Sequence, residues 1–197
     1  VFIPLIREIE TLTNSTYGKL EKTDISIRVI ADHLRTVYFA IADGQLPSNT
    51  GAGYVIRRIL RRAIRYGYTF LNQSDPFIYK LVKILSNQFK GCFDEIFTQK
   101  ELIESIVHEE EKSFLRTLAS GIERLNNMIK KSDLKTISGK EVFELFDTYG
   151  FPADLTSLIL KENNMSFNIN EYKNQLEKQR DRSKKSSKSV ISCLLYT

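Results

Sequence analysis

The sequence predicts an all-α fold, a helical bundle of one or two lobes followed by a disordered basic tail at the C-terminus. Three observations support this class. Residues that lose little freedom in a helix, such as Leu, Ile, Lys, Glu and Arg, are abundant, while the 197 residues include only nine glycines and four prolines. Apolar residues recur at spacings of three and four along most of the chain. No pair of segments shows the alternation that is typical of neighbouring strands.

The first well-marked helix is predicted over residues 24–43, where apolar side chains repeat at helical spacing and Asp24 is placed to cap the start. Residues 44–51 concentrate turn residues, and Pro47 disfavours helical geometry at the residue before it. This stretch is therefore expected to be a loop. Helical periodicity resumes over residues 54–70.

Asp75 and Pro76 supply a cap and a first-turn proline for a further helix, which is predicted to run to about residue 89. A long amphipathic segment over residues 93–129 follows, either as one helix or as two. We expect residues 1–130 to form the first lobe.

The second lobe is expected over residues 131–182, beginning with a short helix. Ser138 has capping-box spacing to the glutamate three residues later, and Gly150 is placed to end this helix. Asp154 can cap the next one. Charge and serine then dominate, so residues 183–197 are predicted to be a disordered tail.

Composition excludes several classes of protein. The chain has 42% hydrophobic residues and a formal charge of +5, which argues against an entirely disordered chain. No run of about 18 uncharged apolar residues occurs, so no membrane span or membrane partner is expected. Residues 1–10 lack the order of a signal peptide, and a cytoplasmic location is predicted, with an organelle as the alternative. Cys92 and Cys193 belong to no Cys-x-x-Cys pair, which gives a zinc site no support.

The most distinctive local feature is a set of five arginines within one predicted helix that contains no acidic residue. At about 100° per residue they fall within roughly 140° of arc, with apolar side chains, Val55 among them, on the opposite side. One interpretation is a solvated face that pairs with acidic neighbours at residues 109–111. The other is a surface that follows phosphates, because the planar guanidinium bonds phosphate oxygens in pairs. The arginines are Arg57, Arg58, Arg61, Arg62 and Arg65.

Two further residues extend this surface. Tyr54 lies on the same arc, where it can stack on a base, bond a ribose or simply pack. The helix follows directly after the Pro47-Ser48-Asn49 loop, so a polar loop tip adjoins the basic helix. Asn49 can contact a base edge from this position, although asparagine is also a routine turn residue.

The sequence predicts no catalytic residue and no metal site. His33 lies on a mostly apolar helix and is interpreted as structural, and His108 has no second histidine at ligand spacing. Gly121-Ile122-Glu123-Arg124 continues a helical apolar period. No glycine loop for phosphates and no serine–histidine pair is present. The chain is therefore expected to present a binding surface.

Four stretches together resemble alanyl-tRNA synthetase, in the same order and at matching separations. They are RVIADH at residues 28–33, IADG with LPSN at 41–49, GYVIRRILRRA at 53–63 and LFDTYGFPADLT at 145–156. The resemblance extends over about residues 2–182. Ala52 departs from it, because a basic residue is common there, and residues 186–197 do not resemble the family.

The resemblance implies the helical tRNA-recognition region that follows the class II catalytic core. The family's catalytic domain, with its ATP and alanine pockets, would lie upstream, and its editing domain downstream. The family recognises the G·U wobble pair in the acceptor stem of alanine tRNA through an asparagine and an aspartate, which correspond to Asn49 and Asp147. ATP and Mg²⁺ are implied for the parent enzyme, while the fragment itself is expected to hold no cofactor and to be inactive alone.

Two alternatives to this function remain open from the residues. A helical scaffold can use its basic face to dock an acidic protein or another domain of its own chain. A free-standing enzyme would instead have to form an adenylate or charge tRNA by itself.

Overall fold

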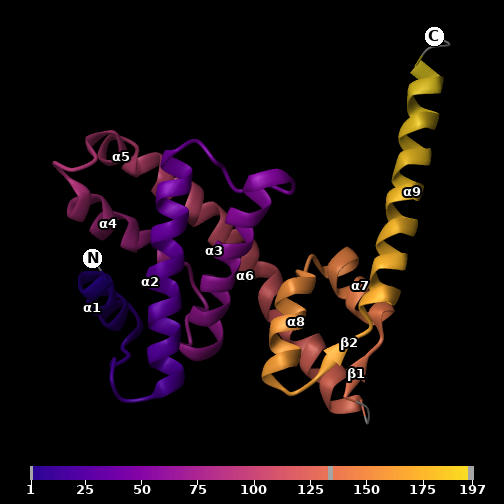
Figure 1. The fold of residues 1–197 in the computed structure, drawn as a ribbon, viewed down its shortest axis with the longest axis horizontal. Helices are drawn as coiled ribbons and strands as arrows, with labels where there is room; N and C mark the ends of the chain where they lie inside the picture. The colour runs from indigo at the N-terminus through magenta and orange to yellow at the C-terminus, as the bar shows by residue number, and fades with distance from the viewer. Residues whose placement is uncertain (1, 133–134, 195–197) are drawn as a thin grey trace. The chain divides into compact units, whose positions relative to one another are not determined.

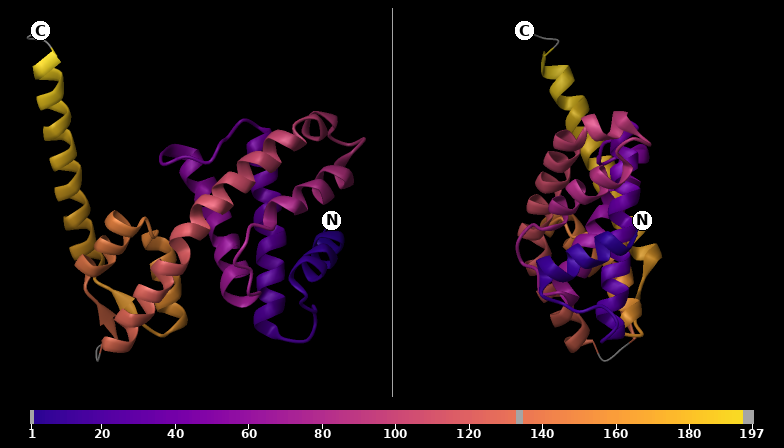
Figure 2. Two further views of the ribbon diagram at one scale, coloured as in Figure 1. Left: turned by 180° about the vertical axis from the view of Figure 1, so that it is seen from behind. Right: turned by 90° about the vertical axis from the view of Figure 1, so that its left-hand side faces the viewer.

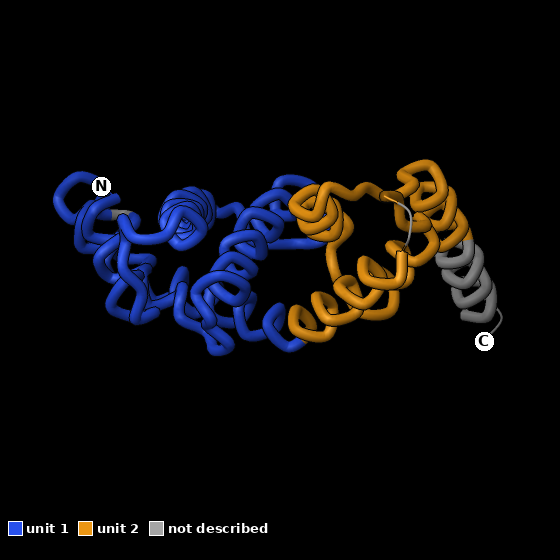
Figure 3. Tube along the Cα trace, turned by 90° about the horizontal axis from the view of Figure 1, so that it is seen from below, with its two compact units in different colours: residues 1–116 blue, residues 117–197 orange. Residues whose placement is uncertain are grey.

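The computed structural model describes residues 2–132 and 135–194, with side chains described up to residue 181 except at position 95. Within these residues the fold is all-α apart from one pair of two-residue strands, as the sequence predicts. The chain forms two compact units, residues 1–116 and 117–197 (Figure 3). The boundary between the two units, after residue 116, lies inside one continuous helix. The sequence places the boundary later, after residue 130.

Unit 1 contains helices and one short 3₁₀ segment (Figure 1). They are α1 (Phe2–Thr13), α2 (Glu21–Ala42), α3 (Gly51–Phe70), η1 (Ile78–Leu81), α4 (Val82–Phe89), α5 (Asp94–Thr98) and the first part of α6 (Lys100–Lys131). The amphipathic segment that the sequence left as one helix or two is therefore two helices, a short α5 and a long α6.

The core of unit 1 is built on α2 and α3, which pack side by side (Figure 2). Leu34 and Ile41 on α2 and Leu60 and Ile64 on α3 are buried, in agreement with the apolar stripe of the sequence. Gly67 of α3 allows Phe77 to pack closely against this helix, because it carries no side chain. A Cβ there would overlap the ring of Phe77 at 2.7 Å.

Two predicted N-caps are wrong. Helix α2 begins at Glu21 with Leu20 in the cap position, and Asp24 instead accepts a hydrogen bond from the backbone N–H of Gly18 at 2.8 Å. Helix α8 has Pro152 in the cap position with no side-chain cap, so Asp154 lies in the first turn. In both cases the helix starts earlier than the aspartate.

The predicted Asp75 cap is also wrong, because a distant side chain caps that segment. Glu111 of α6 accepts hydrogen bonds from the backbone N–H groups of Phe77, Ile78 and Tyr79, at 2.9, 3.0 and 3.3 Å. Three of the donors that a helix start leaves without intrahelical partners are thus bonded by one buried carboxylate.

Unit 2 contains the rest of α6, then β1 (Thr136–Ile137), α7 (Gly139–Tyr149), α8 (Ala153–Glu162), β2 (Ser166–Phe167) and α9 (Ile169–Leu194). The strands pair in parallel, with Thr136 opposite Ser166. The sequence did not predict them, because two residues carry no periodicity. The predicted tail, residues 183–197, has all of its side chains outside the described residues.

Both predicted ends of α7 are confirmed. The hydroxyl of Ser138 accepts a bond from the N–H of Lys140 at 3.1 Å, and Gly150 adopts a left-handed conformation with φ of 63°. The capping-box partner that the sequence indicated, Glu141, is wrong, because the carboxylate at this start belongs to Glu171 of α9, which accepts from Gly139 N–H at 2.8 Å. Helix α7 is therefore held at both ends.

Candidate nucleic-acid interface

The five arginines of α3 differ strongly in exposure. Arg58 and Arg62 are exposed, Arg57 and Arg61 are half-buried, and Arg65 is only 2% exposed. The five arginines therefore do not all lie on one exposed face of α3. Residues four apart share a side of a helix, so the inner three form one row along α3.

Part of the inner row packs against α6. A nitrogen of Arg57 lies 2.5 Å from a carboxylate oxygen of Glu110, and the guanidinium of Arg61 lies 4.9 Å from the ring centroid of Phe114. The two α3 residues are one turn apart, and so are their two partners on α6. This arrangement bears out, for Arg57, the interpretation that the arginines pair with acidic neighbours.

The innermost arginine packs against aromatic rings of its own helix. The guanidinium of Arg65 lies 5.2 Å from the ring centroid of Tyr66 and 5.1 Å from that of Phe70. Delocalised guanidinium charge is more weakly hydrated than an ammonium, and it stacks on such rings. Arg65 therefore contributes to packing.

The outer face of α3 carries the exposed cations. Arg58 and Arg62 share it with Val55, whose side chain is 52% exposed although the sequence assigned it to the buried side. The error arises because a helical wheel gives the direction of each side chain but not the direction from which α6 covers α3. Tyr54, in the first turn, is 46% exposed.

The loop before α3 lies close against its first turn. Ser48 N–H donates to the backbone oxygen of Gly53 at 3.0 Å. A Cβ at Gly53 would overlap both Leu46 O and the Ser48 hydroxyl, so only glycine allows this approach. The loop that carries Asn49 is thus fixed to the helix.

Asn49 is exposed, and its amide is oriented by a hydrogen bond. Arg57 Nη1 donates to Asn49 Oδ1 at 2.5 Å. Because the oxygen accepts this bond, the Nδ2 donor is the end of the amide turned away from Arg57.

Asp147 is exposed near the C-terminal end of α7 in unit 2. Its Oδ1 accepts a hydrogen bond from the side-chain amide of Gln179 on α9. Two residues further along, the ring of Tyr149 packs against Arg124, whose guanidinium carbon is 3.9 Å from the ring centroid. Asn49 belongs to unit 1 and Asp147 to unit 2, and the predicted convergence of the two stays a prediction.

Glu111, the residue after Glu110, has a strongly raised pKa. Burial raises the pKa of Glu111 to about 7, against the opposing effect of the three backbone N–H donors. The sequence gave no signal of this, since the backbone that Glu111 caps lies 32 to 34 residues away.

Comparison with known proteins identifies the family. The model of the family described as "tRNA synthetases class II (A)" matches residues 1–194. The chain belongs to the class II (A) tRNA synthetase family.

Curated relatives within this class II synthetase family carry a more specific name. The alanine–tRNA ligase of Christiangramia forsetii is 60% identical over 187 residues, which cover 95% of this chain and 22% of the relative. The alanine–tRNA ligase of Bacteroides fragilis is 54% identical, covering 93% and 21%. That of Flavobacterium psychrophilum is 50% identical over 196 residues. The chain spans about a fifth of the length of these relatives.

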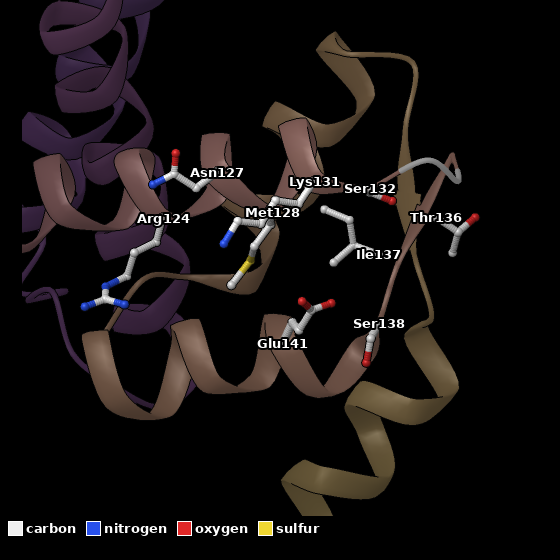
Figure 4. A pocket seen from close by; sticks show the side chains of 9 residues that line it. All are labelled: Arg124, Asn127, Met128, Lys131, Ser132, Thr136, Ile137, Ser138 and Glu141. Carbon is white, nitrogen blue, oxygen red and sulfur yellow. The ribbon is translucent and has the colours of Figure 1, made fainter.

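Unit 2 of the class II synthetase chain also contains a pocket of about 510 Å³ that the sequence did not indicate. In Figure 4 the side chains of Met128, Lys131 and Glu141 extend toward the hollow, while Arg124 lies at its edge. Cationic and anionic groups both line it.

The described part of the chain contains neither a metal-binding cluster nor a membrane-spanning helix. Among the residues whose side chains are described, 2–94, 96–132 and 135–181, no group of three His, Cys, Asp or Glu side chains is arranged to hold a metal ion. In the same residues, no helix combines the length and apolar content needed to cross a membrane.

Proposed function

We propose that this chain is the helical tRNA-recognition region of an alanine–tRNA ligase, which binds the acceptor stem of alanine tRNA and recognises its G·U wobble pair. Family membership and the names of the relatives support the enzyme class. The observation that carries the recognition step is that Asn49 and Asp147 are both exposed and that the Asn49 amide is oriented by a hydrogen bond from Arg57. Polar groups that are fixed in advance bind a partner with less loss of entropy.

The parent enzyme would use ATP and Mg²⁺ to attach alanine to its tRNA, in the cytoplasm or in an organelle that makes protein. We assign these groups to a catalytic domain upstream and expect an editing domain downstream. Neither unit of the described chain is proposed to bind them. The chain by itself is expected to bind tRNA without forming an adenylate.

The wobble pair presents chemistry that suits the two side chains. In G·U the guanine 2-amino group has no pairing partner and projects into the wide, shallow minor groove of RNA, where proteins can contact base edges. Asp147 would accept a bond from that amino group, and Asn49 Nδ2 would donate to uracil O2. In a G·C pair the same amino group is used in pairing, so the carboxylate is less well satisfied.

The two exposed arginines of α3 are the proposed phosphate contacts. Arg58 and Arg62 share the outer face of the helix, and such contacts fix position without reading sequence. Tyr54 is exposed at the start of this face and is proposed to contact a ribose. Arg57, Arg61 and Arg65, which the sequence also assigned to the tRNA backbone, are proposed to support the surface from inside.

Binding of two acceptor-stem helices that differ only at the wobble position, G·U against G·C, tests the function. A mismatched pair typically costs about 1–3 kcal/mol, so the unaltered chain should prefer G·U by about 5-fold to 150-fold. Asn49→Ala and Asp147→Ala should each reduce this preference. Glu144→Ala is the matched control, because Glu144 is an exposed acid on the same helix as Asp147. Equal affinity of the unaltered chain for both helices would refute the function.

A further inference from the structure

One guanidinium connects the loop of Asn49 to helix α6. Arg57 Nη1 donates to Asn49 Oδ1, and Nη2 donates to Glu110 Oε1, both at 2.5 Å. Nη2 also lies 3.5 Å from the backbone oxygen of Pro47. All four residues belong to unit 1, so one side chain contacts two points of the loop and one of the neighbouring helix.

This guanidinium is poorly placed to meet a phosphate. The side chains of Arg57 and Glu110 are 20% and 16% exposed, and the carboxylate already compensates the positive charge. A phosphate would have to displace that carboxylate from its hydrogen bond. Arg58, the next residue, is exposed, in contrast to Arg57.

We propose that Arg57 is a positioning residue that sets the orientation of the Asn49 amide, and that Glu110 holds Arg57 in place for this task. The inference rests on the proposed function, because it concerns how Asn49 discriminates. With Oδ1 bound to Arg57, Nδ2 is presented outward as a donor, which is the polarity that uracil O2 requires. The reversed amide would present an oxygen to an oxygen, which is repulsive.

Only arginine can make this connection. Its planar fork supplies separate donors for Asn49 and Glu110 in a fixed geometry, whereas lysine is a point charge on a flexible stem. Arg57→Lys therefore keeps the charge and loses the orientation. The same substitution at Arg58 is the matched control, since it changes a neighbouring exposed arginine of the same helix.

The test measures affinity of the 197-residue chain for the G·U and G·C acceptor helices and compares the ratio of the two. Arg57→Lys should lower the ratio by about 5-fold or more, with less than about a 2-fold change for G·C, because only the oriented donor is lost. Arg58→Lys should change the affinity for both helices alike and so leave the ratio unchanged, because a phosphate contact does not depend on the base pair. Glu110→Gln, which keeps an acceptor and removes the charge, should lower the ratio to a smaller extent. Circular dichroism of each variant checks that it folds.

The combination with Asn49→Ala separates positioning from direct contact. If Arg57 acts through Asn49, then Arg57→Lys should not change the ratio further once Asn49 is alanine. A further fall in that background, or equal weakening of both helices by Arg57→Lys alone, would overturn the inference. These results differ from failure of the proposed function, in which the unaltered chain shows no preference and Asn49→Ala has no effect.

Discussion

The side-chain amide of Gln179 on α9 donates a hydrogen bond to the carboxylate of Asp147 on α7. This N–H donor is of the same chemical kind as the amino group of guanine. Gln179 therefore occupies, within unit 2, one oxygen of the carboxylate that the proposed function assigns to the wobble guanine.

Gln179→Ala should raise the affinity for the G·U helix by about 3-fold to 10-fold, because a net hydrogen bond of about 1 kcal/mol no longer has to be replaced. Titration of a labelled helix measures the change. Gln175→Ala, one turn earlier on α9, is the control and should have little effect. A loss of affinity on removing Gln179 would show that it supports Asp147 and does not compete for it.

Gly53→Ala should destabilise the loop that carries Asn49. The new Cβ would overlap Leu46 O and the Ser48 hydroxyl, and such overpacking typically costs about 1–3 kcal/mol. We expect a lower free energy of unfolding in urea together with a weaker preference for G·U. Ala52→Ser changes the adjacent exposed position and should alter neither quantity. Full retention of both by the alanine variant would contradict the packing described for the loop.

The free energy of unfolding should fall as the pH rises from about 4.5 to about 7. The pKa of Glu111 is raised from 4.5 to about 7 in the folded chain, so the folded state binds the proton more tightly. The contribution of protonated Glu111 to the free energy of unfolding is complete below the unfolded pKa of 4.5. It is lost as the pH passes through the folded pKa of about 7. Glu111→Gln should flatten this dependence, whereas Glu109→Gln, at an exposed position, should not. An unchanged profile in Glu111→Gln would assign the dependence to other groups.

The salt dependence of RNA binding should distinguish the outer arginines from the inner ones. Each of Arg58→Ala and Arg62→Ala should reduce the slope of log affinity against log salt by about 1, through loss of one phosphate contact. Arg65→Ala should lower stability and leave the slope unchanged, because Arg65 is 2% exposed. If all three variants reduce the slope equally, the division of α3 into two faces does not describe its binding.

Helical periodicity was sufficient to predict the fold class and the positions of most helices, since the apolar stripe of α2 is a property of neighbouring residues. The cap at Ser138 was predicted because its hydroxyl bonds the nearby N–H of Lys140, whereas the carboxylate at the same helix start comes from the distant Glu171. The cap at Phe77 comes from Glu111, which a local pattern cannot reveal. The two paired strands were not predicted either, because two residues carry no periodicity.

The candidate residues were predicted from motifs, but their environments were not. The periodicity of α3 gave the direction of each arginine side chain around the helix. The packing of α6 against α3 then determines that Arg57 contacts Glu110 while Arg58 stays exposed. The contact between Asp147 and Gln179 joins residues 32 apart on two helices. Such relationships depend on packing, which the sequence pattern of one helix does not specify.

Substitution of inosine for the wobble guanine tests the central claim most directly. Inosine keeps the wobble pairing with uracil and lacks the 2-amino group that Asp147 is proposed to bind. The unaltered chain should bind the inosine helix about 10-fold to 100-fold more weakly, as expected for a hydrogen bond to a charged acceptor, and Asp147→Ala should bind both helices equally. Equal binding of the two helices by the unaltered chain would contradict the account.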